Sequence, residues 1–389
     1  MTKKKKVQWF WMWVIGSVTL RLILVYFPRN LNLSSRPEVS TPLTSLRRLA
    51  EGYWLKRSSM SPYAGSMYHG SPLLLTFLGP LTVTRIEGQP DQLLCSLVFV
   101  IADVISATLI RAAGRSLQAA YSSSLKVIGL HQLSETSGLA SLAAFGWVLA
   151  THLSLYPSIL IIPVILLLGY GPDAPPRKLF QQRIKLEVGN SSSIGSNNLK
   201  EELKDQSSVL KVFAWRLVVH FFIWILLWSS YVLVLCGIYL QKHGGLQELY
   251  RRTYGFILTI PDLSPNIGVL WYFFAEVFDF FRSFFLMVFH GNILLMIMPL
   301  ALRLNHRPCF LAFVYIVISS LLKSYPSVGD SALYLGLLGL FSYELKDIRF
   351  SFLLFAGYVG VSLLSPVMHN LWIWRVWIFG LMNIIILRS

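Results

Sequence analysis

A polar turn followed by an aromatic run contains the residues of this sequence best suited to ligand chemistry. Asp262, Ser264 and Asn266 alternate with prolines, and a run that includes Trp271 and Tyr272 follows shortly after. Carboxylate and amide groups hydrogen-bond to sugar hydroxyls, and aromatic rings stack on the faces of sugars. At a membrane surface this combination predicts the binding of a glycolipid. The alternative is that Asp262 or Ser264 only caps the helix that follows.

Two further carboxylates, Glu276 and Asp279, stand three residues apart beyond the aromatic run. This spacing puts both on one face of a helix, where paired carboxylates could act together. The alternative is that they form the solvated face of a helix lying at the membrane interface.

Asp103 stands in the middle of an otherwise apolar run at residues 93–110. A charge at bilayer depth costs at least about 2.5–3.5 kcal/mol unless it is paired or hydrated. Asp103 therefore predicts one of two things: a contact with a lipid headgroup or an ion, or a structural pair inside a helix bundle.

Sequence patterns of well-known catalytic and metal sites are absent. The sequence contains no GxSxG, no HExxH, no Walker loop and no GxGxxG between a strand and a helix. The histidines are scattered, and the three cysteines lie in or beside apolar runs without CxxC or Cys/His spacing. We therefore predict no catalytic residue, no metal site and no cofactor.

The composition places most of the chain in a membrane. Hydrophobic residues make up 54% and charged residues 13% of the 389 positions, and the mean hydropathy is +0.58. Soluble domains carry about 25% charged residues, so this chain has too few to cover a surface that faces water. The net charge of +16 comes from basic residues in short gaps between apolar runs, where they orient membrane spans rather than bind nucleic acid. We predict an all-α fold, a polytopic transmembrane helix bundle that forms one domain over residues 1–389.

The polar segments between the apolar runs define the predicted topology. The lysines at Lys3–Lys6 precede a first span that is too long for a signal peptide, which places the N-terminus in the cytosol. We then expect a first luminal loop at residues 28–71, a basic cytosolic loop at 171–211 and a second luminal loop at 241–270. The first luminal loop contains several basic residues, and these oppose the assignment because basic residues favour the cytosolic side of a membrane.

The predicted sidedness allows two arrangements of the intervening apolar segments. In one, the short piece Leu73–Val83 spans the membrane. In the other, the proline-interrupted block Leu139–Tyr170 crosses twice as two short spans. Either arrangement alone returns the chain to the side of the N-terminus.

Three separate stretches resemble the PIG-U family, whose members are subunits of the glycosylphosphatidylinositol (GPI) transamidase. The stretches are Glu38–Leu75, Tyr254–Glu276 and Lys323–Tyr334, and the chain looks like a shortened plant-type member. The resemblance implies a multi-pass protein of the endoplasmic reticulum membrane whose partners are the other transamidase subunits, the GPI glycolipid and membrane lipids. It also implies a subunit without catalysis of its own, because the family's catalytic Cys/His pair belongs to a different subunit.

The third stretch, Lys323–Tyr334, is also expected at the luminal end of the bundle, so its polar residues join the predicted binding site. The predicted glycolipid-binding residues are Asp262, Ser264, Asn266, Trp271, Tyr272, Glu276, Lys323 and Asp330. Two departures from the family pattern accompany them. A pair of membrane segments with an Asn-Pro-Tyr-type motif, normally found between the region after Ile110 and the block that begins at Leu139, is missing. The sequence after Trp374 also leaves the pattern.

The first polar loop is also similar to that of the C-type glycosyltransferases, enzymes that use lipid-linked sugars. Those enzymes place an acidic pair near the start of the loop, whereas this chain has Glu38 there and no Asp. Deprotonating a sugar hydroxyl needs a positioned base, so we expect the same membrane fold to bind glycolipid without sugar transfer. The alternative is a mannosyltransferase of the C type in GPI-anchor assembly, with Glu38 or Glu51 as its base.

Overall fold

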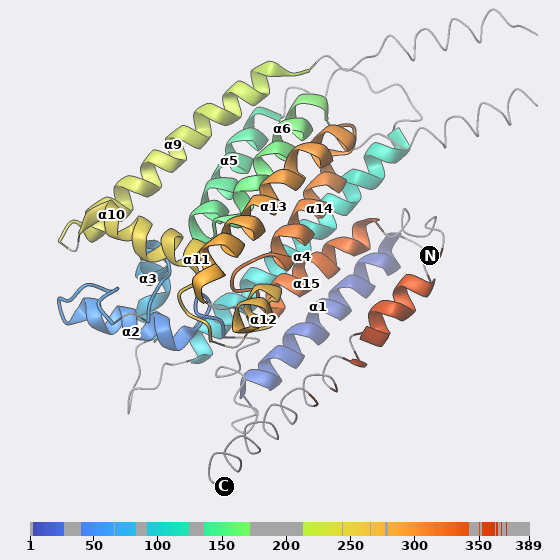
Figure 1. The fold of residues 1–389 in the computed structure, drawn as a ribbon. Coiled ribbons are helices and arrows are strands. Elements are labelled where there is room, and N and C mark those ends of the chain that lie inside the picture. The colour runs from blue at the N-terminus through green and yellow to red at the C-terminus, as the bar shows by residue number, and fades with distance from the viewer. Residues whose placement is uncertain are drawn as a thin grey trace, which may run out of the picture. The chain divides into compact units, whose positions relative to one another are not determined.

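The computed structural model describes most of the chain between Lys3 and Phe341. The described residues are 3–26, 40–65, 67–82, 92–123, 136–171, 213–242, 244–264, 266–276, 279–341 and several short pieces between 350 and 371. Within them every regular element is a helix (Figure 1), which confirms the predicted all-α fold. The chain divides into two compact units, residues 1–336 and 337–389, and the predicted binding residues all belong to the first.

Three helices of the first unit are long and apolar enough to cross a membrane. They are α4 (Gln92–Ser123), α9 (Trp215–Leu240) and α13 (Arg282–Arg303). At 1.5 Å per residue, a helix of about 20 residues spans the roughly 30 Å hydrocarbon core. Their outward side chains are large and apolar, such as Leu226 and Leu295, as a lipid-facing surface requires. The prediction of a helical membrane bundle is confirmed.

Shorter apolar helices complete the bundle of the first unit. They are α5 (Thr136–Leu153), α6 (Ile161–Tyr170), α14 (Pro308–Leu321) and α15 (Val328–Leu338), the last of which continues across the boundary between the units. Helix α1 (Lys3–Tyr26) also belongs to the bundle, and its apolar stretch is Gln8–Leu24. In the second unit, the structure describes the helical turn η7 (Gly339–Phe341) and an apolar helix at Phe352–Val361.

The proline-interrupted block folds as two antiparallel helices. The end of α5 lies at the end of α9, because His152 Nε2 is 3.5 Å from the Cys236 sulfur. The end of α6 lies at the start of α9, because the amide of Ala214 donates to the carbonyl of Gly169 at 3.1 Å. The two helices therefore run in opposite directions, joined by the short helix η4 (Tyr156–Leu160), which has Pro157 in its first turn. This hairpin is the shape expected if the block crosses twice, and the crossing itself stays a prediction.

The piece beginning at Leu73 is too short to span. Helix α3 (Pro72–Leu78) and the turn η2 (Gly79–Thr82) together reach about 16 Å at helical rise. They pack instead on α2 (Leu46–Arg57), an amphipathic helix with Leu49, Gly52 and Leu55 buried. Gly52 is required there, because a Cβ at this position would lie 2.7 Å from Cγ of Tyr68.

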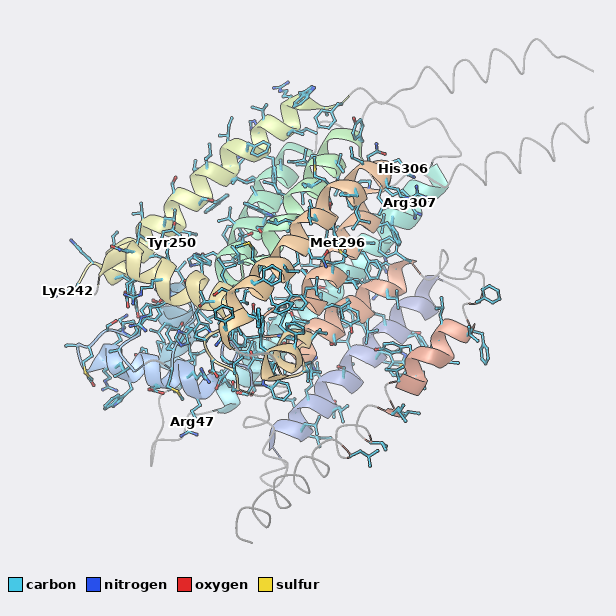
Figure 2. The ribbon with its side chains drawn as sticks, viewed as in Figure 1. Arg47, Lys242, Tyr250, Met296, His306 and Arg307 are labelled. Atoms are coloured by element: carbon cyan, nitrogen blue, oxygen red, sulfur yellow. The ribbon has the colours of Figure 1, made fainter. Side chains whose placement is uncertain are left out.

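Short helices gather at one end of the first unit, which we call the loop end. It contains α2, α3, α10 (Gly245–Leu249), the π-helical turn η5 (Tyr250–Tyr254), α11 (Gly255–Thr259) and α12 (Val269–Glu276) (Figure 1). Figure 2 shows Arg47, Lys242 and Tyr250 at this end, and His306 and Arg307 at the opposite end.

The arrangement of the two ends agrees with the predicted grouping of the loops. The described parts of the loops at 28–71 and 241–270 share the loop end, whereas Gly171 and Phe213, the described residues on either side of 172–212, lie at the opposite end of α6 and α9. The assignment of the loop end to the lumen, like the predicted loop boundaries, stays a prediction.

Candidate functional site

Three stretches that are far apart in the sequence meet at the loop end of the bundle. The guanidinium of Arg48, on α2, forms an ion pair with the carboxylate of Asp262 at 2.7 Å. The hydroxyl of Tyr325 donates to the backbone carbonyl of Asp262 at 3.0 Å. Each residue comes from a different one of the three stretches that resemble the PIG-U family, so the structure brings these stretches into one site.

A stack of rings continues this contact into the bundle. The imidazole of His69 lies on the ring of Phe256 at 3.6 Å between centroids, and Phe256 stacks on Tyr325 at 5.3 Å. His69 Nδ1 is 3.1 Å from the carbonyl of Arg252. Arg48, His69, Phe256, Asp262 and Tyr325 are called the loop cluster below.

The predicted polar turn is held by its own side chains. Asp262 Oδ1 accepts a hydrogen bond from the amide of Ser264 at 2.9 Å, and the indole of Trp271 donates to the carbonyl of Leu263 at 2.9 Å. Asn266, with 6% of its surface exposed, accepts from the amide of Gly268 at 2.7 Å. These are Asx-type turns. Asp262 therefore closes the turn itself, several residues before α12 begins at Val269.

Lys323 and Asp330 pair with one another at the start of α15. The ammonium of Lys323 lies 3.0 and 3.2 Å from the two oxygens of Asp330. The same carboxylate accepts from the amide of Ser327 at 2.9 Å and from its hydroxyl at 3.2 Å, so it caps the first turn of the helix. About a fifth of each side chain of the pair stays exposed, 16% and 20%.

Several predicted residues lie only partly within the described residues. Tyr272 and Glu276 have their backbones in α12, but their side chains, and that of Asp279, lie outside the described residues. The predicted pairing of Glu276 with Asp279 therefore stays a prediction. Asp103 lies away from the loop cluster, on α4, and forms an ion pair with Arg21 of α1.

The electrostatics of Asp262 favour its charged form. Burial raises the pKa of this carboxyl, but the hydrogen bonds from Ser264 and the guanidinium of Arg48 outweigh burial, so the pKa lies below its ordinary value of 3.8. The side chains of Arg48 and Asp262 keep 17% and 26% of their surface exposed. The pair is thus formed and ionised, yet within reach of a ligand.

A buried polar group beneath the loop cluster was not foreseen from the sequence. His152 Nε2 lies 2.7 Å from the hydroxyl of Ser71, and Nδ1 lies 3.2 Å from the hydroxyl of Tyr254. Ser71 also caps α3 by accepting from the amide of Leu73, and both Ser71 and His152 are buried. The contact therefore joins the end of α5 to the start of α3 and to η5. No sequence spacing indicates it, because its members lie on separate helices.

The described side chains of the loop end can bind but show no arrangement for metal chemistry. No three metal-ligating side chains come together anywhere in the described part of the chain. What the loop end does present is a partly exposed ion pair, a second ion pair at Lys323 and Asp330, and exposed aromatic rings such as Trp54 and Tyr250.

Comparison with known proteins gives this arrangement a family. A family model described as GPI transamidase subunit PIG-U matches residues 15–132 and 127–376, so it accounts for most of the chain. The chain belongs to the PIG-U family. The resemblance predicted from the three stretches is confirmed, and so is the role of a GPI transamidase subunit.

Curated relatives agree over nearly the whole chain. The chain is 28% identical over 408 residues to the human GPI-anchor transamidase component PIGU, covering 93% of this chain and 85% of the relative. It is 27% identical over 388 residues to the GPI transamidase component GAB1 of Saccharomyces cerevisiae and 26% identical over 386 residues to its Schizosaccharomyces pombe homolog, in each case covering 92% of this chain and 85% of the relative.

The comparisons also bear on the missing membrane segments. The two parts of the family match meet at residues 127–132, between Ile110 and Leu139, where the segment pair is predicted to be missing. The alignment with the human relative, at 408 residues, is longer than the 389 residues of this chain, so the chain must be gapped in it. Residues 124–135 lie outside the described residues, and the omission of the segment pair stays a prediction.

Proposed function

We propose that this GPI transamidase subunit holds the GPI glycolipid at the loop end of its bundle, on the luminal side of the endoplasmic reticulum membrane. In this proposal the chain presents the glycolipid to other subunits of the complex and does not itself make or break the bond to the protein. The observation that carries the proposal is the convergence of the three family stretches on the Arg48–Asp262 pair.

The chemistry of the loop end suits the two polar parts of such a ligand. A glycosylphosphatidylinositol carries a phosphate group and several sugars. Exposed basic side chains of the loop end, those of Arg47, Arg57, Lys242 and Arg251, are suited to the phosphate. Exposed aromatic rings of the loop end, such as those of Trp54 and Tyr250, are suited to the sugars.

The partly exposed ion pair gives the ligand a defined place to bind. Because Arg48 already lies on Asp262, an approaching phosphate can share the guanidinium, which has more donors than one carboxylate uses. Asp262 can in turn accept a sugar hydroxyl at the exposed edge of its carboxylate. Ser264 lies at the same turn, held there by the hydrogen bond from its amide to Asp262.

The rival function, a mannosyltransferase, is the less favoured one. It would require a positioned base, for which the sequence offers Glu38 or Glu51. Glu38 lies outside the described residues, and the relatives are named as transamidase components rather than as glycosyltransferases.

The test replaces the pair in cells that depend on this chain for GPI anchoring. We expect Arg48→Ala and Asp262→Ala to lower the surface level of a GPI-anchored reporter several-fold, while complete GPI lipid and uncleaved reporter precursor accumulate. Arg303→Ala, an exposed arginine at the opposite end of α13, serves as the matched control and should leave anchoring unchanged. The abundance of each variant in the membrane is measured alongside.

Two outcomes would contradict the proposal. Normal anchoring in both variants of the pair at normal abundance would remove the loop cluster from glycolipid handling. Accumulation of glycolipids that lack mannose, especially in a Glu38→Ala variant, would support the mannosyltransferase instead. Lost anchoring with complete GPI glycans favours the subunit.

A further inference from the structure

An ion pair lies on the outer surface of the bundle, within the apolar part of two helices. Arg21 of α1 pairs with Asp103 of α4, and the two side chains keep 44% and 53% of their surface exposed. The apolar stretch of α4 begins at Leu94, so Asp103 lies about 14 Å along the helix axis from it. This is close to the middle of a hydrocarbon core of about 30 Å.

The two helices that carry the pair run antiparallel. Eight residues beyond Asp103, the guanidinium of Arg111 lies 4.0 Å from the centre of the ring of Phe10, while Arg21 follows Phe10 on α1. Residue numbers therefore rise in opposite directions along α1 and α4 from one contact to the next. The two contacts also determine which side of each helix faces the other.

Lipid hydrocarbon offers no hydrogen-bond partner for the donors and acceptors that the ion pair leaves unused. An arginine has five N–H donors and a carboxylate has about four acceptor sites, and one ion pair uses only part of them. Ionised side chains within membrane spans almost always face a bundle interior or a water-filled cavity. The described residues supply neither, because they leave about half of each side chain of the pair uncovered.

Small side chains border the pair on both helices. Ser17, four residues before Arg21, and Ser106, three residues after Asp103, share the helical faces of the pair and are exposed. The hydroxyl of Ser106 donates to the carbonyl of Ala102, which keeps it close to its own helix. Small residues at such positions let a second helix approach closely.

We propose that the face formed by Arg21, Asp103, Ser17 and Ser106 is the docking surface for a transmembrane helix of another transamidase subunit. This inference rests on the proposed function, because it needs the chain to work within the complex. The partner helix carries small residues for close approach and a hydrogen-bonding side chain, such as Asn, Gln, Ser or Thr, at the depth of the ion pair. Lipid tails have no such group, and a helix that covers the pair removes it from the hydrocarbon.

The test separates docking from folding by leaving the ion pair intact. Ser106→Trp adds bulk to the proposed face, and Ile105→Trp adds the same bulk one residue away, about 100° round α4, at a side chain that is 53% exposed. The full chain is purified from membranes in mild detergent, and the co-purified transamidase subunits are quantified against it. We expect Ser106→Trp to lower their yield at least about fivefold and Ile105→Trp to leave it at the wild-type level, both at normal abundance of the chain.

A second pair of variants tests the charges themselves. Asp103→Asn removes the ion pair, whereas Arg21→Asp with Asp103→Arg keeps an ion pair and reverses its direction. If the pair serves a partner helix, the reversed pair keeps the chain abundant but loses the other subunits.

Three results distinguish the possible failures. Wild-type recovery of the subunits with Ser106→Trp and with the reversed pair overturns the docking surface while the proposed function stands. Loss of a bound anionic lipid, with the subunits retained, in Arg21→Gln overturns it in favour of a lipid headgroup at this place. Failure of the unaltered chain to bring any transamidase subunit with it contradicts the proposed function itself.

Discussion

At the scale of single residues, Asp262 connects three stretches of the loop end. One of its carboxylate oxygens accepts a hydrogen bond from the amide of Ser264, and the other accepts one from the guanidinium of Arg48. Its backbone carbonyl accepts a hydrogen bond from the hydroxyl of Tyr325. A buried or half-buried carboxylate with several donors is stabilised in its charged form. The same residue can therefore shape the turn and still offer charge to a ligand.

The lowered pKa of Asp262 predicts how the loop end responds to acid. A carboxyl whose pKa is lower in the folded protein than in the unfolded one stabilises the fold at pH values above its unfolded value of about 3.8, and this contribution is lost as the pH falls through the lowered folded pKa. We expect the Arg48–Asp262 pair to couple by about 1 kcal/mol at neutral pH, as measured by a double-mutant cycle of Arg48→Ala and Asp262→Ala in thermal unfolding of the detergent-solubilised chain.

The matched control for this prediction is Asp262→Asn, which keeps an acceptor for the turn and removes the titrating group. The difference in melting temperature between the wild type and Asp262→Asn should shrink as the pH is lowered below 3.8. A difference that stays constant over the acid range would show that the pair contributes no charge-dependent stability.

At the scale of elements, the α5–α6 hairpin determines which ends of the helices lie on the same side of the first unit. The long apolar block is interrupted at Pro157, whereas Pro163 lies inside α6. The chain reverses at Ser154–Tyr156, where the amide of Ser324 donates to the hydroxyl of Tyr156 at 2.9 Å. The hairpin turn therefore shares the side of α2, and the turn after α13 lies on the opposite side.

This arrangement predicts the sidedness of single introduced cysteines. In sealed microsomes, a membrane-impermeant maleimide should label Asn305→Cys at once, and should label Ser58→Cys and Ser154→Cys only after the membrane is opened. Ser58 and Asn305 are exposed in the structure and report the two ends of the bundle. Labelling of Ser154→Cys together with Asn305→Cys would contradict the hairpin.

At the scale of the whole molecule, two natural glycosylation sequons test the orientation. Asn32-Leu33-Ser34 belongs to the predicted luminal loop and Asn190-Ser191-Ser192 to the predicted cytosolic loop, and both lie outside the described residues. We expect no glycan on Asn190. Arg57→Asn creates a sequon with Ser58 and Ser59 on an exposed turn of the loop end, and it should be glycosylated, as seen by a shift in electrophoretic mobility that a glycosidase reverses. A glycan on Asn190 would reverse the predicted sidedness of the first half of the chain.

The sequence by itself determined that the chain is a membrane helix bundle and which stretches carry its family membership. In hydrocarbon each helix satisfies its own backbone hydrogen bonds, so apolar runs and the prolines that break them identify the helices locally. The polar turn beside an aromatic run was sufficient to select Asp262, and the family resemblance of the third stretch implied Lys323 and Asp330.

Only the tertiary structure decided what these groups touch. Arg48 and Asp262 are 214 residues apart, and no local pattern in the sequence pairs them. The contact of His152 with Ser71 and Tyr254, and the choice of Arg21 as the partner of Asp103, likewise depend on which helices pack together. Side-chain pairing between helices follows from packing over the whole bundle, and a local pattern of residue types cannot specify it.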